Sequence, residues 1–448
     1  MLTSFTLKNF KSFKEATLPL TPTVTFLIGA NGSGKSNALD ALTLLKWLGK
    51  GKSLREIESE MNSPSHPLLR CPSSEMVNWF DGDTFEFDCT LELENDIYSY
   101  SIVIQMDNNG KLTFKKERLV NRREKGIVYT TDKEEAKGQN IPPLVDLIRK
   151  EFGNDGQALF FGLKVFSHLI KLNALSEDER DTILSVSKVT EQIRNLFSSI
   201  FFLEPNPKEM RGYARQIERM TFSESGENLS AVLEELCRDE KVKNDILDLI
   251  RSLPEQEIVD IKFSKTDENF MMVKLEESFS NKHHKTPAYS LSDGTLRVLA
   301  IATALYSVPK GSLLIIEEVD NGIHPSRIQH LVNKMYEIAA ERKIQILVTT
   351  HDPAMMNAIP PQEKGNVLCC YRDKEDGCSK VVRLSDSPQY IDILTNGRLG
   401  SLVASPKFDD IIKKTSEERQ KEHEAWVEQY KKEQEEYHKA LKKAFGED

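Results

Sequence analysis

Gly29-Ala30-Asn31-Gly32-Ser33-Gly34-Lys35-Ser36 is the stretch that decides the fold, because it fits the Gly-x-x-x-x-Gly-Lys-Ser phosphate loop at every required position. Residues 23–28 before it are typical of a short buried strand, and residues 37–48 after it carry apolar side chains at helical spacing. Glycines let the loop amides converge on one centre, where an anion also meets the positive end of the helix dipole. The pattern therefore predicts a phosphate site with contacts from Asn31, Gly32, Ser33, Gly34, Lys35 and Ser36.

A second stretch supplies the carboxylates that a bound metal needs. Residues 313–316 form an apolar strand that ends in Glu317 and Glu318. Lys35 would place its ammonium on the terminal phosphates, and the Ser36 hydroxyl would complete the shell of a magnesium ion. Glu317 would bind that ion directly or through water, and Glu318 would polarise the water that attacks the terminal phosphate. A strand that merely ends in solvated charges is the alternative interpretation.

Composition narrows the class of protein. The chain has 448 residues, 39% of them hydrophobic and 29% charged, which is typical of a soluble protein with two or three lobes. Its net charge of -10 argues against a generic polyanion binder, although a local basic patch stays open. Six cysteines lack Cys-x-x-Cys spacing, which favours reduced thiols. With no signal-peptide core and no apolar run long enough to cross a bilayer, we expect a cytoplasmic protein without membrane contact.

The periodicity changes twice along the chain. Residues 84–93, 98–106 and 111–119 alternate apolar and polar side chains, which predicts antiparallel strands in a layer separate from any parallel core. Residues 142–254 then show helical spacing, interrupted by Pro205 and Pro207, and predict an all-helical lobe. Residues 415–445 predict a charged helical tail whose aromatic stripe packs on its own domain or contacts a second protein.

A third motif makes a specific resemblance visible. Leu291-Ser292-Asp293-Gly294-Thr295 precedes a predicted helix and resembles the Leu-Ser-Gly-Gly-Gln signature of ATP-binding-cassette (ABC) ATPases. As in that family, it lies just upstream of the acidic strand. The resemblance implies that Asp320 lies in the loop that crosses to a partner subunit. It also implies that His351, after the apolar run 344–350, is the switch residue that senses the terminal phosphate.

The opening Leu7-Lys8-Asn9-Phe10-Lys11-Ser12-Phe13, the Glu-Glu ending of the acidic strand and the later His324-Pro325 narrow the resemblance. They are similar to the RecF, SMC and OLD branch, and within it to compact AAA-type ATP-binding proteins of bacterial anti-phage systems. The chain departs from the ABC pattern at Glu317, where an aspartate is usual, and at two signature positions, Asp293 and Thr295. Gln105, at the end of a predicted strand, is a candidate for the glutamine loop.

This resemblance implies an α/β fold, namely an ABC-ATPase head with a mixed or parallel core sheet, an antiparallel β layer, an inserted all-helical lobe and a C-terminal helical tail. The expected boundaries are 1–140 for the N-terminal ATPase half with the antiparallel layer, 141–256 for the helical lobe, 257–405 for the C-terminal ATPase half and 406–448 for the tail.

It also implies a mechanism. ATP and Mg²⁺ would bind between two copies, each lending Ser292 and Gly294 to the ATP held by the other, in a homodimer or a larger ring of dimers. The ATPase would sense a signal and control a separate effector in anti-phage defence, as in PARIS-type systems with a Toprim-like partner or Septu-type systems with an HNH nuclease. The residues after His351 carry no recognisable Toprim fold, so we expect no nuclease in this chain.

The alternative is a RecF- or SMC-like clamp that binds DNA during repair. It needs a basic track, and the only dense basic run is Lys115, Lys116, Arg118, Arg122, Arg123 and Lys125. Charge runs of this kind are more often solvated faces. The long coiled-coil arms of SMC proteins are absent from the pattern. A transporter motor subunit, a third interpretation, is disfavoured by the N-terminal motif and by the Glu-Glu ending.

Overall fold

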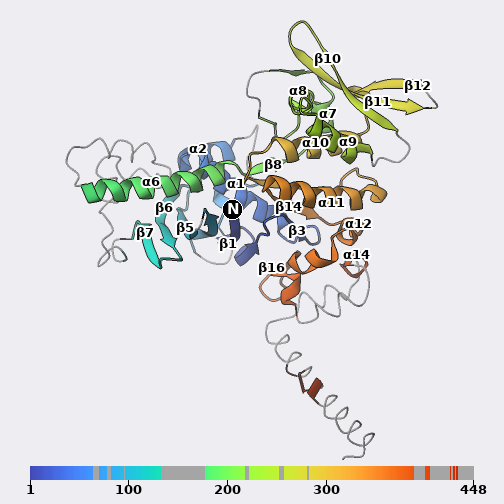
Figure 1. Cartoon of the computed structure of the whole chain (residues 1–448). Coiled ribbons are helices and arrows are strands. Elements are labelled where there is room, and N and C mark those ends of the chain that lie inside the picture. The colour runs from blue at the N-terminus through green and yellow to red at the C-terminus, as the bar shows by residue number, and fades with distance from the viewer. Residues whose placement is uncertain are drawn as a thin grey trace, which may run out of the picture.

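The computed structural model describes residues 1–63, 70–77, 82–94, 96–132, 135, 177–216, 221–251, 257–279, 282–387, 399–403, 424, 427, 428, 430 and 431. Within these ranges the chain builds two sheets flanked by helices (Figure 1), so the predicted α/β class is confirmed. Most of the predicted tail, 406–448, and residues 141–176 of the predicted helical lobe lie outside the described residues. None of the described helices combines the length and the apolar character that crossing a bilayer requires.

A parallel core forms one half of the large sheet. Its strands, in spatial order, are β15 (Leu368–Arg372), β3 (Val24–Ile28), β14 (Gln345–Thr350), β13 (Leu313–Ile316) and β8 (Phe201–Leu203). Every residue of β3, β13 and β14 is buried, as expected for parallel strands that are covered on both faces. Parallel strands end at the same edge, so the residues that follow β3, β13, β14 and β8 lie close together.

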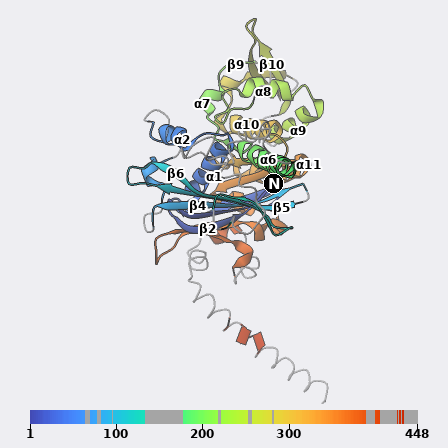
Figure 2. The same cartoon turned by 90° about the vertical axis from the view of Figure 1, so that its left-hand side faces the viewer.

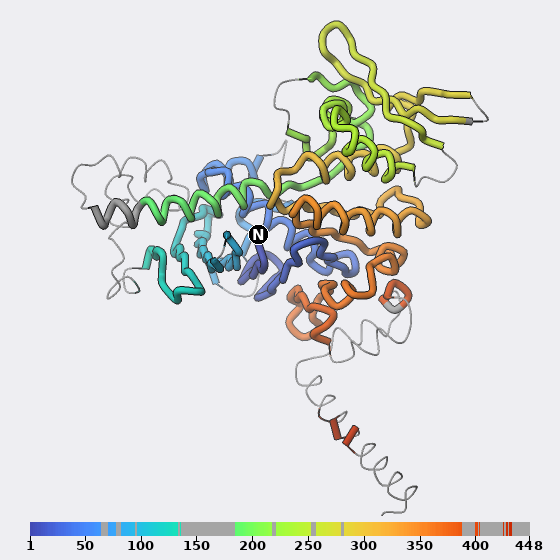
Figure 3. Tube along the Cα trace, in the orientation of Figure 1, coloured from blue at the N-terminus to red at the C-terminus, as the bar shows by residue number. Residues whose placement is uncertain are grey.

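Antiparallel strands form the other half. They are β1 (Leu2–Phe10), β2 (Phe13–Pro19), β4 (Thr84–Leu93), β5 (Asp96–Met106), β6 (Leu112–Asn121), β7 (Gly126–Thr130) and β16 (Ser379–Arg383). The alternating pattern of β4, β5 and β6 is as predicted, but the separate layer is not. The N-terminal strand β1 pairs with both β2 and β4, and β2 pairs with β16. Strand β16 also pairs with β15 of the parallel core, which joins both parts into one twelve-stranded sheet within the described chain. In Figure 3 the N-terminus lies between the cyan segments on the left and the orange segments on the right.

Helices pack against the two sheets and against one another. They are α1 (Lys35–Gly49), α2 (Leu54–Met61), α6 (Glu177–Ser198), α7 (Pro207–Met210), α8 (Leu229–Leu236), α9 (Glu240–Arg251), α10 (Asp293–Ser307), α11 (Pro325–Arg342), α12 (Pro353–Asn357) and α14 (Leu399–Val403). Short 3-10 turns lie at Ser73–Glu75, Ala288–Ser290, Pro361–Asn366 and Leu384–Asp386. Helix α1 packs against α6, and a Cβ on Gly49 would lie 2.6 Å from the Cβ of Phe197. Figure 2 shows α1 and α6 above the strands β2, β4 and β5.

A second sheet lies over α8, α9 and α10, at the top of Figure 1. It contains β10 (Ile258–Lys265), β11 (Phe270–Phe279) and β12 (Lys282–Pro287), with β9 (Ala214–Arg215) paired to β11. The predicted all-helical lobe is therefore wrong in detail, because β8 and β9 are strands. Their backbone partners, β13 and β11, are distant in sequence, so local periodicity could not reveal the pairing.

The hydrophobic core has one cluster on each face of the large sheet. Val24, Phe26 and Ile28 of β3 pack in the cluster that contains α10 and α11, whereas Leu27 packs with α1 and the antiparallel strands. This alternation follows from the two-residue period of a strand. It anchors β3 from both sides, and with it the loop that starts at Gly29.

Candidate nucleotide-binding site

The phosphate loop joins β3 to α1. Gly34 precedes α1 with a φ of 115°, and no side chain caps the helix, so its first amides face the loop. A Cβ on Gly34 would lie 2.3 Å from Ser379 Oγ, and Gly32 has a φ of 76°. The positive φ of Gly34 and the close contact that a Cβ would make there both require glycine at this position. The backbone thus forms the cradle that the sequence predicts.

Two side chains of this loop fit an anionic ligand. Lys35 Nζ donates to the carbonyl oxygens of Gly29, at 2.7 Å, and Ala30, at 3.1 Å, which folds the ammonium over the loop. Partial burial lowers the pKa of Lys35. Ser33 Oγ is buried and has no hydrogen-bond partner among the described residues. A phosphate would satisfy both groups, because its oxygens accept hydrogen bonds and carry negative charge.

The predicted metal-binding pair is brought together. Ser36 Oγ donates to Glu317 Oε1 at 3.0 Å, and Arg70 forms an ion pair with the other Glu317 oxygen. A hydroxyl and one carboxylate suit Mg²⁺, which keeps several waters and takes further oxygens from substrate phosphates. No group of three or more His, Cys, Asp or Glu residues that could hold a metal occurs in the part of the chain that the structure describes. The residues therefore fit a substrate-bound Mg²⁺ rather than an all-protein metal cage.

The predicted general base has an unusual backbone. Glu318 has a φ of 47°, in the left-handed region that side chains other than glycine rarely adopt. Its amide donates to Thr349 Oγ1 at 3.0 Å, and its carboxylate accepts from Asn321 Nδ2 at 2.7 Å. Strained backbone of this kind is often found at functional sites, held there by surrounding contacts. Here the hydrogen bonds on both sides of Glu318 fix the carboxylate next to Glu317.

Asp320 and His351 lie at the same edge of the sheet. Asp320 is only 8% exposed, and its Oδ1 accepts from Thr350 Oγ1 at 2.6 Å. Its side chain is therefore held by β14 of its own chain, and the crossing of its loop to a partner subunit stays a prediction. His351 is exposed and directly follows β14, which neighbours β3. This position lies near the phosphate loop, as expected for a residue that senses a phosphate.

The signature residues are at the start of α10. Ser292 caps the helix, its Oγ accepting from the amide of Thr295 at 3.1 Å, and both Ser292 and Asp293 are exposed. A Cβ on Gly294 would lie 2.2 Å from the carbonyl oxygen of Gly322. The signature helix therefore touches the turn that follows Glu318, backbone against backbone.

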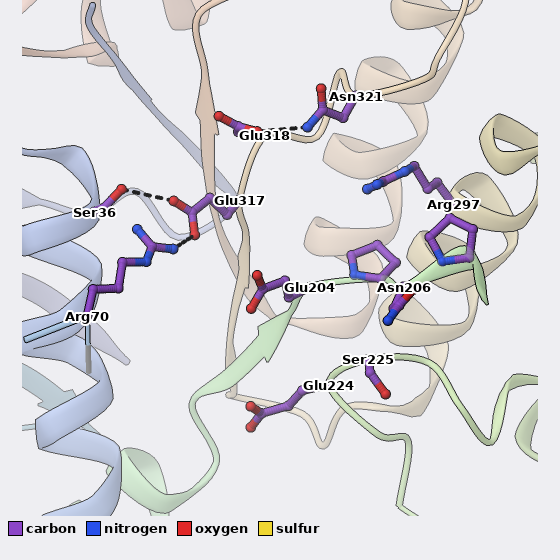
Figure 4. Close-up of a pocket in the computed structure, with 12 residues that line it drawn as sticks. Ser36, Arg70, Glu204, Asn206, Glu224, Ser225, Arg297, Glu317, Glu318 and Asn321 are labelled. Carbon is purple, nitrogen blue, oxygen red and sulfur yellow. Dashed lines mark hydrogen bonds and ion pairs between the residues drawn. The ribbon is translucent and has the colours of Figure 1, made fainter. Parts of the chain in front are cut away.

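A cavity of about 780 Å³ brings Ser36, Glu317 and Glu318 together (Figure 4), whereas Lys35 and His351 are not among its lining residues. Its lining residues are Ser36, Arg70, Glu204, Pro205, Asn206, Pro207, Glu224, Ser225, Arg297, Glu317, Glu318 and Asn321. Ser36, Glu317 and Glu318 thus face one space. The phosphate loop contributes through Ser36, the acidic strand through Glu317 and Glu318, and the signature helix through Arg297.

The sequence interpretation missed several of these residues. Glu204 and Asn206 line the cavity because β8 pairs in parallel with β13, with Leu203 opposite Ile316. The Leu203-Glu204-Pro205-Asn206-Pro207 stretch was the available signal, since a proline-bounded polar run directly follows an apolar triplet. Gln105 is not brought to this site; it lies on β5 and donates to Asp83. Nothing local in the sequence marks Arg70 or Arg297.

The chain is similar to several known proteins. The family described as "AAA domain, putative AbiEii toxin, Type IV TA system" matches residues 24–357. An "ATP/GTP phosphatase" of Helicobacter pylori is 22% identical over 374 residues, 78% of this chain and 85% of that protein.

A protein with a shorter match and one solved structure are also similar to this chain. "DNA replication and repair protein RecF" of Edwardsiella ictaluri is 40% identical over 58 residues. This match covers only 13% of this chain and 15% of the RecF protein. The structure titled "Crystal structure of the SmcHead bound to the C-winged helix domain of ScpA" aligns at 14% identity with a TM-score of 0.47, covering 85% of this chain and 97% of the other.

Proposed function

The chain belongs to the family described as "AAA domain, putative AbiEii toxin, Type IV TA system", and from this premise we propose that it binds and hydrolyses ATP as an ABC-type ATPase. The predicted resemblance to RecF- and SMC-type ATPases is confirmed by the family match and by the similarity to RecF. The carrying observation is the 3.0 Å contact between Ser36 and Glu317, which joins the phosphate loop to the acidic strand inside one cavity.

The predicted site residues have separate chemical roles. Lys35 and the loop amides hold the terminal phosphates, and Ser36 and Glu317 would hold Mg²⁺, which neutralises charge on the phosphates. Glu318, oriented by Asn321, takes a proton from the attacking water. His351 faces the terminal phosphate and reports its loss. The similarity to a protein named "ATP/GTP phosphatase" over 78% of the chain supports the hydrolytic step.

The complete site needs a second copy. In the described residues each chain offers one phosphate loop and one signature, in which Ser292 and Asp293 are exposed and Gly294 is half-buried. We place ATP between the loop of one copy and the signature of the other, in a homodimer or an oligomer of such dimers. ATP then acts as an adhesive, because its terminal phosphate supplies contacts that hydrolysis removes.

The proposed role of the dimer is to control a separate effector protein. The family description names a putative toxin, which supports a role linked to toxicity. We propose a sensor and scaffold in anti-phage defence whose effector is a Toprim-like or HNH nuclease. The RecF-like DNA clamp is the alternative. Lys116 and Arg118 of the basic run pair with Asp132 and Glu135, at 2.9–3.1 Å, which reduces the charge available to DNA and favours the scaffold.

One experiment tests the catalytic and assembly parts together. Purified protein is assayed for phosphate release with ATP and Mg²⁺, and its mass is measured by light scattering with and without ATP. We expect hydrolysis in the parent, none in Lys35→Ala, and an ATP-dependent dimer in Glu318→Gln. A parent that neither binds nor hydrolyses ATP would contradict the proposal. Co-purification of a nuclease from the native host favours the scaffold, whereas a salt-dependent mobility shift on DNA favours the clamp.

A further inference from the structure

Arg211 and Asp293 form an ion pair at the start of the signature helix. Arg211 Nη2 lies 2.6 Å from Asp293 Oδ1 and also donates to the carbonyl oxygen of Leu291 at 3.0 Å. Asp293 is the first residue of α10, and its side chain is 64% exposed. Neither the phosphate loop nor the acidic strand contributes to this pair. Arg211 is outside every motif on which the proposed function depends.

The pair answers an electrostatic problem. A carboxylate at the first position of a helix interacts favourably with the helix dipole. The same carboxylate repels an anion that approaches the helix amides, and Ser292 and Gly294 are the residues expected to meet a phosphate. Side chains cannot relieve this repulsion from Gly294, because a Cβ there would collide with Gly322. Arg297 of the same helix lines the cavity, and the charge that pairs with Asp293 comes from outside the helix, from Arg211.

Arg211 is well placed to supply that charge. It directly follows α7, which begins at Pro207, one of the residues that line the cavity. Its guanidinium is held by two acceptors on either side of Ser292, the Leu291 carbonyl and the Asp293 carboxylate. Its side chain is 29% exposed, so it keeps a face toward solvent at the signature. A guanidinium that is fixed in this way can hold the backbone at Leu291 and cancel the charge of Asp293 at once.

We propose that Arg211 is a positioning residue for the phosphate contact made in trans. It neutralises Asp293 and fixes the turn at Leu291, so that the start of α10 accepts the terminal phosphate of a nucleotide bound by a second copy. This inference rests on the proposed function and assigns to it a residue from a distant segment of the chain. Asp293 without Arg211 would turn the signature into a surface that repels phosphate.

The test uses the Glu318→Gln chain, so that ATP is not consumed. Two quantities are measured: the dimer dissociation constant with ATP, by sedimentation equilibrium, and the affinity of dilute monomer for a fluorescent ATP analogue. Arg211→Met should weaken the dimer about fivefold or more, since one positive charge is lost beside an anion, while monomer affinity stays unchanged. Arg211→Lys should weaken it less. Arg238→Ala, which removes an exposed arginine paired with Glu234 on α8, is the matched control.

The double variant, with Asp293→Gly added to the Arg211→Met chain, is the decisive comparison. If charge cancellation is the role of Arg211, removing the carboxylate should restore most of the lost dimer affinity. An Arg211→Met chain that dimerises like the parent would overturn the inference, and so would a double variant as weak as Arg211→Met alone. If Arg211→Met unfolds, Arg211→Lys and Asp293→Gly are compared with the parent instead, and equal dimer affinities in all three overturn it. A parent Glu318→Gln chain that stays monomeric with ATP contradicts the proposed function itself.

Discussion

Ser36 and Glu317, which are 281 residues apart in the sequence, meet through a 3.0 Å hydrogen bond from Oγ to Oε1. The contact joins the first turn of α1 to the end of β13. Both residues reach it because β3, β14 and β13 are parallel neighbours and end at the same edge. The proposed nucleotide chemistry depends on this edge, and most of the following predictions alter a residue there.

Lys35→Ala should abolish nucleotide binding. The ammonium is expected to contact the terminal phosphates, so its loss should weaken ATP affinity about 100-fold or more, as measured by calorimetry. The two bonds from Lys35 to loop carbonyls are local, and thermal unfolding should show that the variant is folded. Nucleotide affinity equal to that of the parent would refute the interpretation of the loop.

Glu318→Gln should bind ATP and accumulate as an ATP-held dimer. The amide keeps the shape of the side chain but cannot take a proton, so hydrolysis should fall about 100-fold or more. Asn321→Ala is the matched variant, because it removes the 2.7 Å bond that orients the carboxylate and should lower the rate less. Phosphate release is the measurement, and a Glu318→Gln rate equal to the parent's would show that another group is the base.

Gly294→Ala should separate assembly from nucleotide binding. The new methyl would lie 2.2 Å from the Gly322 carbonyl, so the start of α10 and the turn after Glu318 must move apart. We expect ATP-dependent dimerisation to fall about tenfold or more while the monomer's affinity for nucleotide changes little. Gly126→Ala is the matched control, because Gly126, like Gly294, is not in the left-handed region and has no atom within 4 Å of its would-be Cβ. Equal loss of both activities would contradict the separation.

Arg70→Ala should change the dependence on Mg²⁺. In the structure the Arg70 guanidinium occupies one Glu317 oxygen, and a cation cannot take that oxygen until Arg70 moves. Removing the competitor should lower the Mg²⁺ concentration for half-maximal ATP binding about threefold or more. The titration follows nucleotide fluorescence at fixed ATP, with Arg238→Ala as the control. A higher Mg²⁺ requirement would instead make Arg70 a contact of the phosphates.

Acid should destabilise the chain through Asp260. Burial alone would raise its pKa, but hydrogen bonds from Lys243, at 2.7 Å, and Lys262 outweigh this and hold the pKa at about 2. Because the folded pKa lies below the unfolded one, the stabilisation is complete above about pH 4 and is lost as the pH falls to about 2. Asp260→Asn should lower the free energy of unfolding by at most about 2 kcal/mol at pH 7.

Urea unfolding at several pH values measures this difference. The gap between the parent and Asp260→Asn should close as the pH falls from about 4 to about 2. A gap that is constant over this window would show that the two lysines contribute nothing through the charge of Asp260.

The sequence predicted the parts of the site that are encoded locally. Gly29 to Ser36 specify a strand, loop and helix within a short window, so the cradle could be predicted with its contacts. Glu317 and Glu318 follow a short strand, and the apolar run from Leu313 to Ile316 predicted that this strand is buried. The Ser292 cap was also visible, since a cap needs only its own helix.

Contacts between distant segments could not be predicted. Glu204 reaches the cavity only because β8 pairs with β13, and strand pairing across such a distance leaves no local trace. For the same reason the sequence did not reveal that the antiparallel strands join the parallel core, since β2 pairs with β16 and β16 pairs with β15. Asp320 is held by a hydrogen bond from Thr350, which lies on another strand. Arg70 lies in a polar segment, and Arg297 is the one arginine in the mostly apolar signature helix, so neither local pattern indicates that its side chain lines the cavity.

The close approach of Gly294 to Gly322 has a kinetic consequence for a pair of such chains. When a chain loses the terminal phosphate of its own ATP, the turn after Glu318 would change its contacts. That turn packs against the start of α10, which in the proposed dimer contacts the ATP of the other chain. The two hydrolysis events in one assembly would therefore not be independent. Turnover should show cooperativity in ATP, and a mixed assembly with one inactive subunit should lose more than half of its rate.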